Sequence, residues 1–421
     1  MIGLFSGESA VFRALKYRNY RLFFLGQGIS LTGTWVQHVA LQWLVYKITF
    51  SSLTLGFVGF LGQLPIFLFA PVAGVIVDRS RKKRMVIITQ MLCLIQAFLL
   101  FAMTLRGHVQ VWQLACLAFF LGTVNSFDIP GRQALLTQMV IRKEDFGNAI
   151  ALNSSLVNIA RLLGPMLAGF LLSTAGESVC FLINALSYFA ALAALFAMKD
   201  LPREQTAPKH SIQQGLTEGF AYVSRHPKVR AVLILIAAIS FTGMPYLVLM
   251  PVFAHELFKG GPLTLGLLLS ASGFGALAGV LSFARKQHYA DLEKLIVGSL
   301  AFFGLSLTGF AFSKVLALNL VLAALAGAGA MVQLASSNTL LQMTVEEDKR
   351  GRVMSLYTTA LLGVAPFGNL FIGALAHRFG PGPTLALSGV FCMGIALAAS
   401  RLKDLHRPFD GVLKPPPADL P

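Results

Sequence analysis

The stretch "GVIVDRSRKKRM", from Gly74 to Met85, places five basic residues and one carboxylate between two long apolar runs. An apolar helix of about 20 residues crosses the hydrocarbon core of a bilayer. Lys and Arg collect in the cytoplasmic loops of membrane proteins. The stretch therefore predicts a cytoplasmic loop between two membrane-spanning helices, at 53–77 and 85–105.

Apolar runs of the same kind recur along the whole chain. Of its 421 residues, 56% are hydrophobic and 12% are charged, whereas a soluble domain is about 25% charged. Long core helices of a soluble protein are the alternative, and the number of runs disfavours it. We therefore expect an all-α integral membrane protein. The twelve expected spans are 21–46, 53–77, 85–105, 111–139, 147–173, 178–198, 229–255, 263–284, 294–313, 316–343, 351–377 and 382–401.

The formal net charge of +16 indicates membrane topology rather than nucleic-acid binding. If the N-terminus is cytoplasmic, the loops and helix ends on that side carry 27 of the 34 Lys and Arg residues. This distribution follows the positive-inside rule, so we expect both termini in the cytoplasm. The exceptions are five residues in outward loops and two within helices: Lys47, Arg106, Lys259, Lys314, Arg378, Arg132 and Arg161.

The chain has the pattern of two similar halves. "LTLG" at Leu53–Gly56 recurs at Leu263–Gly266, an offset of 210, and Gly169 matches Gly373 at an offset of 204. Ordered matches at nearly one offset indicate duplication of a six-helix unit. We expect a cytoplasmic segment, a bundle, a cytoplasmic linker, a second bundle and a disordered tail, at 1–20, 21–198, 199–228, 229–401 and 402–421.

The opening stretch resembles the loop signature of major facilitator transporters, G-x-L-a-D-r-x-G-r-k. Gly74, Asp78, Arg79, Lys82 and Lys83 match it, while an arginine replaces the second glycine. Gly74 would let two helices approach closely. Asp78 would lie against the positive N-terminus of the helix that begins near residue 351 and latch the inner gate. A plain positive-inside cluster is the alternative for the basic residues.

The fifth expected span carries "ARLLGPMLAGF", in which Gly164, Pro165, Ala168 and Gly169 stand close together. This resembles the G-P-x-x-G-G element of drug–proton antiporters, with Ala168 in place of one glycine. Small residues permit tight helix packing, and proline bends a membrane helix. The element predicts close packing that helps to seal the outer side.

Ionisable and amide side chains at membrane depth are the candidate substrate and proton pathway. A charge at the bilayer centre costs ~2.5–3.5 kcal/mol on insertion scales, and "SFDIPGRQALLTQM" (126–139) carries two, which share a helix face at i,i+4. One carboxylate facing two guanidiniums favours an anionic or acceptor-rich substrate. A structural i,i+4 pair or gate salt bridge stays open as the alternative for Asp128 and Arg132. The candidates are Asp128, Arg132, Arg161, His38, Gln37, Gln42, Gln333 and Asn338.

The segments "SFDIPGRQALLTQMV" and "NAIALNSSLVNIARLLGPMLAG" are similar to the major facilitator branch of enterobactin-type siderophore exporters and secretion effectors. The resemblance covers about residues 10 to 400. It implies a monomeric exporter of the bacterial inner membrane, driven by proton antiport and acting on a siderophore or drug. An importer or a lysophospholipid flippase of the same fold is the alternative.

The sequence disfavours an enzyme. Its eight histidines are dispersed, its four cysteines stand singly, and no HExxH motif occurs, so we expect no metal site. No GxxxxGK[ST] loop is present, so ATP is not the expected energy source. We expect no cofactor, a proton gradient as the energy source, and only the lipid bilayer and a small-molecule substrate as partners.

Overall fold

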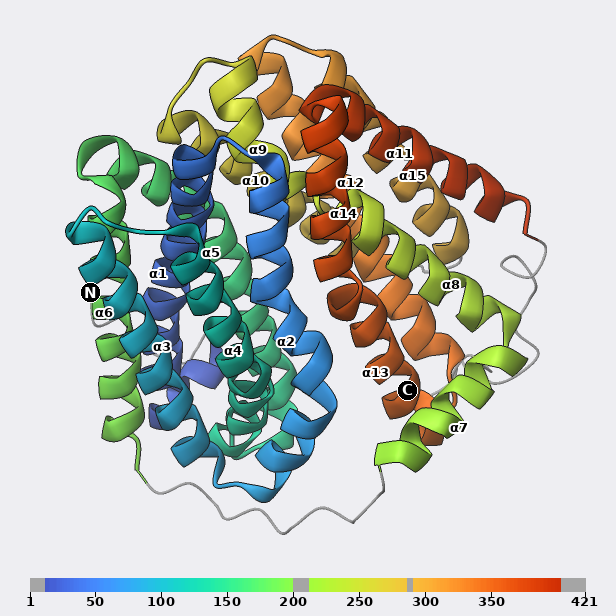
Figure 1. Cartoon of the computed structure of the whole chain (residues 1–421). Helices are drawn as coiled ribbons and strands as arrows, with labels where there is room; N and C mark the ends of the chain where they lie inside the picture. The colour runs from blue at the N-terminus through green and yellow to red at the C-terminus, as the bar shows by residue number, and fades with distance from the viewer. Residues whose placement is uncertain (1–11, 200–211, 286–290, 403–421) are drawn as a thin grey trace.

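The computed structural model describes residues 12–199, 212–285 and 291–402. Within these ranges the chain is nearly all-helical, and its helices form two groups that lie side by side (Figure 1). We call residues 18–197 the first half and residues 227–400 the second half. The expected segment 1–20 and tail 402–421 lie mostly outside the described residues.

The first half contains six long helices, in the places that the apolar runs predict. A short 3-10 helix, η2 (Arg13–Lys16), precedes them, and another, η3 (Lys143–Asp145), follows the fourth. The six helices are α1 (Arg18–Thr49), α2 (Ser52–Arg79), α3 (Lys82–Leu105), α4 (Val111–Met139), α5 (Phe146–Thr174) and α6 (Gly176–Ala197).

The second half follows a short helix, α7, that lies within the expected linker. The helix α7 spans Ile212–Arg225, and the helical segments of the second half are α8 (Pro227–Ala238), η4 (Ile239–Gly243), α9 (Tyr246–Val252), η5 (Phe253–Leu257), α10 (Pro262–Ala284), α11 (Leu292–Phe312), α12 (Leu316–Thr344), α13 (Glu347–Thr358), η6 (Thr359–Gly363), α14 (Ala365–Phe379) and α15 (Pro381–Ser400).

Two spans that we expected as continuous helices, 229–255 and 351–377, are interrupted by π-helical turns, and the sequence prediction is wrong in this respect. The turns are η4, η5 and η6. Pro245 follows η4, Pro251 precedes η5, and Pro366 follows η6. Proline lacks a backbone N–H and its ring crowds the carbonyl one turn back, so the regular α-helical ladder cannot continue unchanged. Single π turns inside helices are frequent at functional sites.

Eleven helices or stacked helices of the described residues are long and apolar enough to cross a membrane. The helix α1 is not among the eleven, although it has 32 residues. Its length exceeds what a bilayer requires, but glutamine, serine, threonine and histidine side chains lower its apolarity. The twelfth span therefore stays a prediction.

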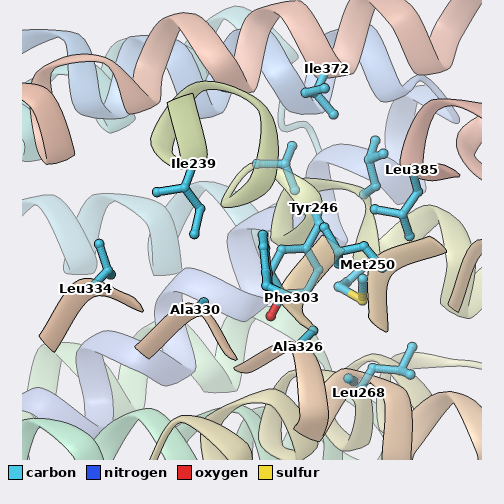
Figure 2. Packing of buried hydrophobic residues seen from close by; sticks show 14 of the residues in the cluster. Ile239, Tyr246, Met250, Leu268, Phe303, Ala326, Ala330, Leu334, Ile372 and Leu385 are labelled. Carbon is cyan, nitrogen blue, oxygen red and sulfur yellow. The ribbon is translucent and has the colours of Figure 1, made fainter. Parts of the chain in front are cut away.

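Backbones approach closely inside each half because small residues face neighbouring helices. An ideal Cβ on Gly275 of α10 would lie 1.7 Å from the Ala324 carbonyl oxygen of α12. Beside this seam, the ring of Tyr246 meets the ring of Phe303 edge-on, with centroids 6.0 Å apart (Figure 2). Close backbone contact is how membrane helices gain packing energy without a hydrophobic driving force.

The two halves touch at two pairs of glycines, and the internal repeat relates one pair to the other. An ideal Cβ on Gly56 of α2 would lie 3.0 Å from Gly373 Cα of α14, and one on Gly266 of α10 would lie 2.9 Å from Gly169 Cα of α5. Ser52 Oγ donates a hydrogen bond to the Gly373 carbonyl, at 3.1 Å. We call this end, which carries the α1–α2 connection, the closed end.

The opposite end, which carries the α2–α3 connection, is not closed in this way. An ideal Cβ on Gly74 or on Gly351 would meet no atom within 4 Å. The helix α13 packs on α7, α8 and α12, all outside the first half, and Figure 1 shows its lower end apart from that of α2. We call this end the open end. The expected close helix approach at Gly74 is therefore wrong for this conformation, since none of the described helices of the other half comes within 4 Å of a Cβ placed there.

Candidate transport pathway

His38 lies midway along α1 and is exposed. Gln42 Nε2 lies 3.1 Å from His38 Nε2, and the Trp35 ring packs edge-on against the imidazole at 5.8 Å. These three residues share one helical stripe with Tyr46, because positions i, i+3, i+7 and i+11 lie on one face. Tyr46 contacts Glu256 of the second half, so this stripe faces the space between the halves.

Arg161 joins this stripe from α5. Its guanidinium carbon lies 5.8 Å from the centre of the Trp35 ring, a geometry in which the ring face attracts a cation. The side chain is half-buried. Among the described residues, no ion pair with a carboxylate is found for Arg161, and Tyr246 of the second half lies within its electrostatic range. The structure therefore brings Arg161 and His38 to the same aromatic ring.

Asp128 and Arg132 form a different, closed network. Arg132 Nε contacts Asp128 Oδ2 at 2.8 Å across one helical turn. Asp128 Oδ1 accepts hydrogen bonds from Thr89 Oγ1 at 2.6 Å and Gln90 Nε2 at 3.0 Å. Arg132 donates to Gln27 Oε1 at 2.6 Å. The pair thus ties α1, α3 and α4 together, with Asp128 only 1% exposed.

This geometry corrects one expectation about the charges. We expected one carboxylate to face two guanidiniums, but the hydrogen bonds and ion pairs of the described residues join Asp128 to Arg132 and not to Arg161. The reason is local, because the i,i+4 spacing on α4 brings Arg132 to Asp128 whereas Arg161 lies on α5 and turns toward Trp35. The i,i+4 pair that the sequence left open is present.

Gln37, another expected pathway residue, lies inside the first half. Its Nε2 donates to Gln96 Oε1 at 2.9 Å, and its Oε1 accepts from Asn184 Nδ2 at 2.8 Å. All three side chains are at most 1% exposed. The pattern of α1 could not reveal these partners, because they lie 59 and 147 residues away.

The expected pathway residues of the second half lie on α12. Gln333 is fully buried, and its Nε2 donates to Ser337 Oγ at 3.3 Å. Its Oε1 is buried without a hydrogen-bond partner. Asn338, half-buried, accepts a hydrogen bond from Gln342. These amides give the second half polar but uncharged groups where α4 carries Asp128.

In the loop after α2, the lysines have specific roles while Asp78 does not show the expected contact. Lys82 Nζ donates to the Val77 and Asp78 carbonyls at 3.0 and 2.6 Å, and Lys83 Nζ donates to the Met198 carbonyl at 2.8 Å. Both satisfy carbonyls at helix C-termini, where a cation is favourable. Asp78 and Arg79 are exposed, and the N-terminus of α13, at Glu347 rather than near residue 351, belongs to the open end. The latch stays a prediction for another conformation.

The small residues of α5 pack where the sequence placed them. An ideal Cβ on Gly164 would lie 2.3 Å from Trp35 Cβ of α1, and one on Gly169 would lie 2.9 Å from the Pro262 carbonyl oxygen. Ala168 is fully buried, and the Pro165 carbonyl lies against α10. The element therefore holds α5 against a helix of each half.

The closed end carries a polar cluster that the sequence pattern did not predict. Tyr46 hydroxyl donates to Glu256 Oε1 at 2.6 Å across the two halves. Lys47 Nζ pairs with Glu177 Oε1 at 2.8 Å. A signal existed, because Tyr46 and Glu256 are separated by the repeat offset of 210, and equivalent residues near a pseudo-two-fold axis meet each other. Within the described ranges, no group of three or more His, Cys, Asp or Glu could hold a metal ion.

Known proteins resemble the chain over most of its length. A family model described as transmembrane secretion effector matches residues 9–408. The staphyloferrin A transporter of Staphylococcus aureus is 25% identical, over 90% of this chain and 94% of that protein. The macrolide efflux protein A of Streptococcus pyogenes is 24% identical, over 93% and 98%. The enterobactin exporter EntS of Shigella flexneri is 24% identical, over 88% of each.

Solved structures share the fold. A bacterial homologue of the human lysosomal transporter Spinster superposes with a TM-score of 0.71 at 15% identity, over 92% of this chain and 98% of that chain. A bacterial homologue of the iron transporter ferroportin gives 0.66 at 15% identity, over 91% and 99%. Together with the family model and the two similar halves, these matches show that the chain belongs to the transmembrane secretion effector family and is a major facilitator transporter, not an enzyme.

Proposed function

We propose that this transporter is a proton-coupled exporter of an anionic or acceptor-rich organic compound. It would have twelve spans and lie in the bacterial inner membrane with its open end and both termini in the cytoplasm. The positive-inside distribution supports this orientation, since the basic stretch from Arg79 to Arg84 lies at the open end. The relatives whose names describe export of siderophores and macrolides support the direction.

The observation that carries the substrate class is the Arg161 guanidinium. A cation at membrane depth normally pairs with a carboxylate or faces a water-filled cavity. Arg161 has the Trp35 ring beside it and no carboxylate ion pair within the described part of the chain. A planar guanidinium of this kind binds carboxylates or catecholates through two parallel hydrogen bonds. His38 and Gln42 on the same stripe supply further donors and acceptors.

The contacts between the halves support alternating access as the transport mechanism. At the closed end the two glycine pairs permit backbone contact, whereas Gly74 and Gly351 at the open end have no such contact with the described residues. Rocking of the two halves about the midplane would break one set of contacts and form the other. Asp78, exposed here, would then reach the N-terminus of α13, and the lysines beside it would keep α2 and α6 intact.

For proton coupling we propose Asp128. It is the carboxylate deepest in the described spans, and Thr89, Gln90 and Arg132 hold it in its present place. Rearrangement of this network as the halves rock would expose the carboxylate to a different environment. Asp128→Asn, which keeps the shape and removes the titration, is expected to uncouple export from the pH gradient.

The test of the substrate class uses proteoliposomes with an imposed pH gradient. The probes are enterobactin as the anionic compound, erythromycin as a macrolide, and a lysophospholipid. Losing a charge-assisted hydrogen bond costs ~1.5–3 kcal/mol, so we expect Arg161→Gln to raise the KM for enterobactin about tenfold or more. Arg161→Lys should retain part of the binding, and Arg106→Gln in the α3–α4 loop is the matched control.

Wild-type enterobactin transport by Arg161→Gln would contradict the assignment of this residue. Transport of the lysophospholipid alone would make the protein a lipid flippase. A dependence on Arg161 that appears only for the macrolide would contradict the anionic class.

A further inference from the structure

The closed end has an interface between the halves that the glycine contacts do not explain. The π-helical turn η5 ends the seventh expected span and lies against the end of α1. Within it, Glu256 accepts the hydrogen bond from Tyr46. The neighbouring residue, His255, is exposed and has a different set of partners.

His255 extends from the second half toward three aromatic rings of the first half. The imidazole centre lies 5.5 Å from the Phe50 ring, 5.7 Å from the Tyr46 ring and 6.5 Å from the Trp43 ring. The face of an aromatic ring carries partial negative charge and attracts a cation within about 6 Å. A protonated imidazole would therefore gain more than a neutral one from the Phe50 and Tyr46 rings, which lie within this distance.

Water can reach this place through a cavity of about 420 Å³ between the halves. Its charged lining residues are Lys47 and Glu177, which pair with each other at 2.8 Å. Beyond this neutral pair, the titratable groups packed around His255 are Glu256 on the same turn and the Tyr46 hydroxyl that bonds to it. Among the described residues no ion pair is found for Glu256, so a proton on His255 would lie beside an unpaired carboxylate.

We propose that His255 is a proton-binding site that controls the outer gate. Protonation strengthens the contact between η5 and α1. It therefore favours the conformation seen here, in which the two halves touch at the closed end. This inference rests on the proposed rocking of the two halves. In that cycle, a proton that arrives from outside after substrate release would close the outer gate. The cavity would then open again at the cytoplasmic end.

The experiment measures the gate directly and without substrate. Spin labels are placed at Arg106→Cys and Lys314→Cys, exposed residues of the two halves at the closed end. Cys116, the exposed cysteine, is replaced by serine. Pulsed electron resonance then gives the populations of short and long distances at about pH 5.5 and pH 8, which bracket the ordinary pKa of histidine.

We expect the ratio of closed to open populations to be about fivefold higher at the acidic pH, the size of one cation–π contact. His255→Gln should abolish this dependence, and His108→Gln, in the α3–α4 loop at the same end, should keep it. His255→Phe retains an aromatic ring without a proton site, so its populations should not vary with pH. Tyr46→Phe should lower the closed-to-open ratio at both pH values by the same factor, so that the fold-change between the two pH values stays as in the wild type.

A pH dependence that persists in both His255 variants would overturn the proposal, as would a wild-type distance that does not change with pH. Transport measurements separate this outcome from the proposed function. If enterobactin is not transported but the distance responds to pH through His255, the substrate assignment fails and the gate site stands. If enterobactin transport follows the proton gradient while the distance is independent of His255, the gate site fails and the proposed function stands.

Discussion

Replacing Asp128 with valine tests whether the Asp128–Arg132 pair holds the first half together. The change removes the carboxylate that Arg132 contacts at 2.8 Å and that accepts hydrogen bonds from Thr89 and Gln90. Breaking a buried ion pair from one side costs about 3–5 kcal/mol. The Arg132 side chain is 21% exposed, so part of its charge remains solvated. We therefore expect a loss in the free energy of unfolding of about 3 kcal/mol.

The second half supplies the matched variant. Val332 and Ser336 occupy the positions of Asp128 and Arg132 in the repeat, at an offset of 204. The double change Asp128→Val with Arg132→Ser removes both charges and leaves chiefly the donors of α3 without an acceptor, at a cost of about 1–2 kcal/mol. We expect the double variant to be more stable than the single one by about 1–2 kcal/mol, a clear departure from additivity.

Unfolding of the full chain in detergent, followed by tryptophan fluorescence during denaturant titration, gives both free energies. A single variant as stable as the wild type, or a double variant less stable than the single one, would refute the structural role. Transport is measured on the same preparations. A double variant that is stable but does not couple export to the pH gradient would assign the pair to coupling.

Two further predictions concern the ends of the molecule. Gly266→Leu places a Cβ 2.6 Å from the Pro165 carbonyl oxygen, so we expect the two halves to separate at the closed end. The distance between labels at residues 106 and 314 should then increase. Gly351→Leu, where a Cβ meets no atom within 4 Å, should leave this distance unchanged. At the open end, the Lys16 ammonium and then the Tyr17 hydroxyl hold the pKa of Asp145 below its usual value. A depressed pKa gives stability that is present above the usual carboxyl pKa and is lost as the pH falls through the folded pKa. Melting temperatures below about pH 4 should therefore fall less for Asp145→Asn than for the wild type, and equal slopes would contradict this.

The two halves differ in their polar side chains but share the glycine contacts of the closed end. Two glycine contacts join the halves, Gly56 with Gly373 and Gly266 with Gly169, and the repeat relates one contact to the other. The charges, in contrast, lie on one side, since α12 carries Val332 and Ser336 where α4 carries an ion pair. Symmetric packing would serve the proposed rocking motion of both halves, whereas the proposed substrate and proton sites need only one of the two halves.

The sequence alone determined the class of protein, the places of most helices and the internal repeat. These features depend on local composition, because about 20 apolar residues must form a helix in lipid whatever their neighbours are. The repeat also related Gly56 to Gly266 and Gly169 to Gly373, but the contact of these glycines across the two halves came only from the structure. The prolines at 245, 251 and 366 are visible in the sequence. Whether a π turn forms beside them depends on how the surrounding helices pack and which groups bond to the carbonyls that lose their helical partner.

Only the tertiary structure decided which polar groups work together. Gln37 looked like a pathway residue until Gln96 and Asn184 proved to surround it inside the first half. Arg161 turned away from Asp128 and toward Trp35, and His255 met three rings of another helix. Periodicity states which face of a helix a side chain occupies, but the rotation and crossing of the helices decide what that face meets. The opening stretch is the clearest case, because its charges gave the topology while its conformation left Asp78 without the helix it was expected to reach.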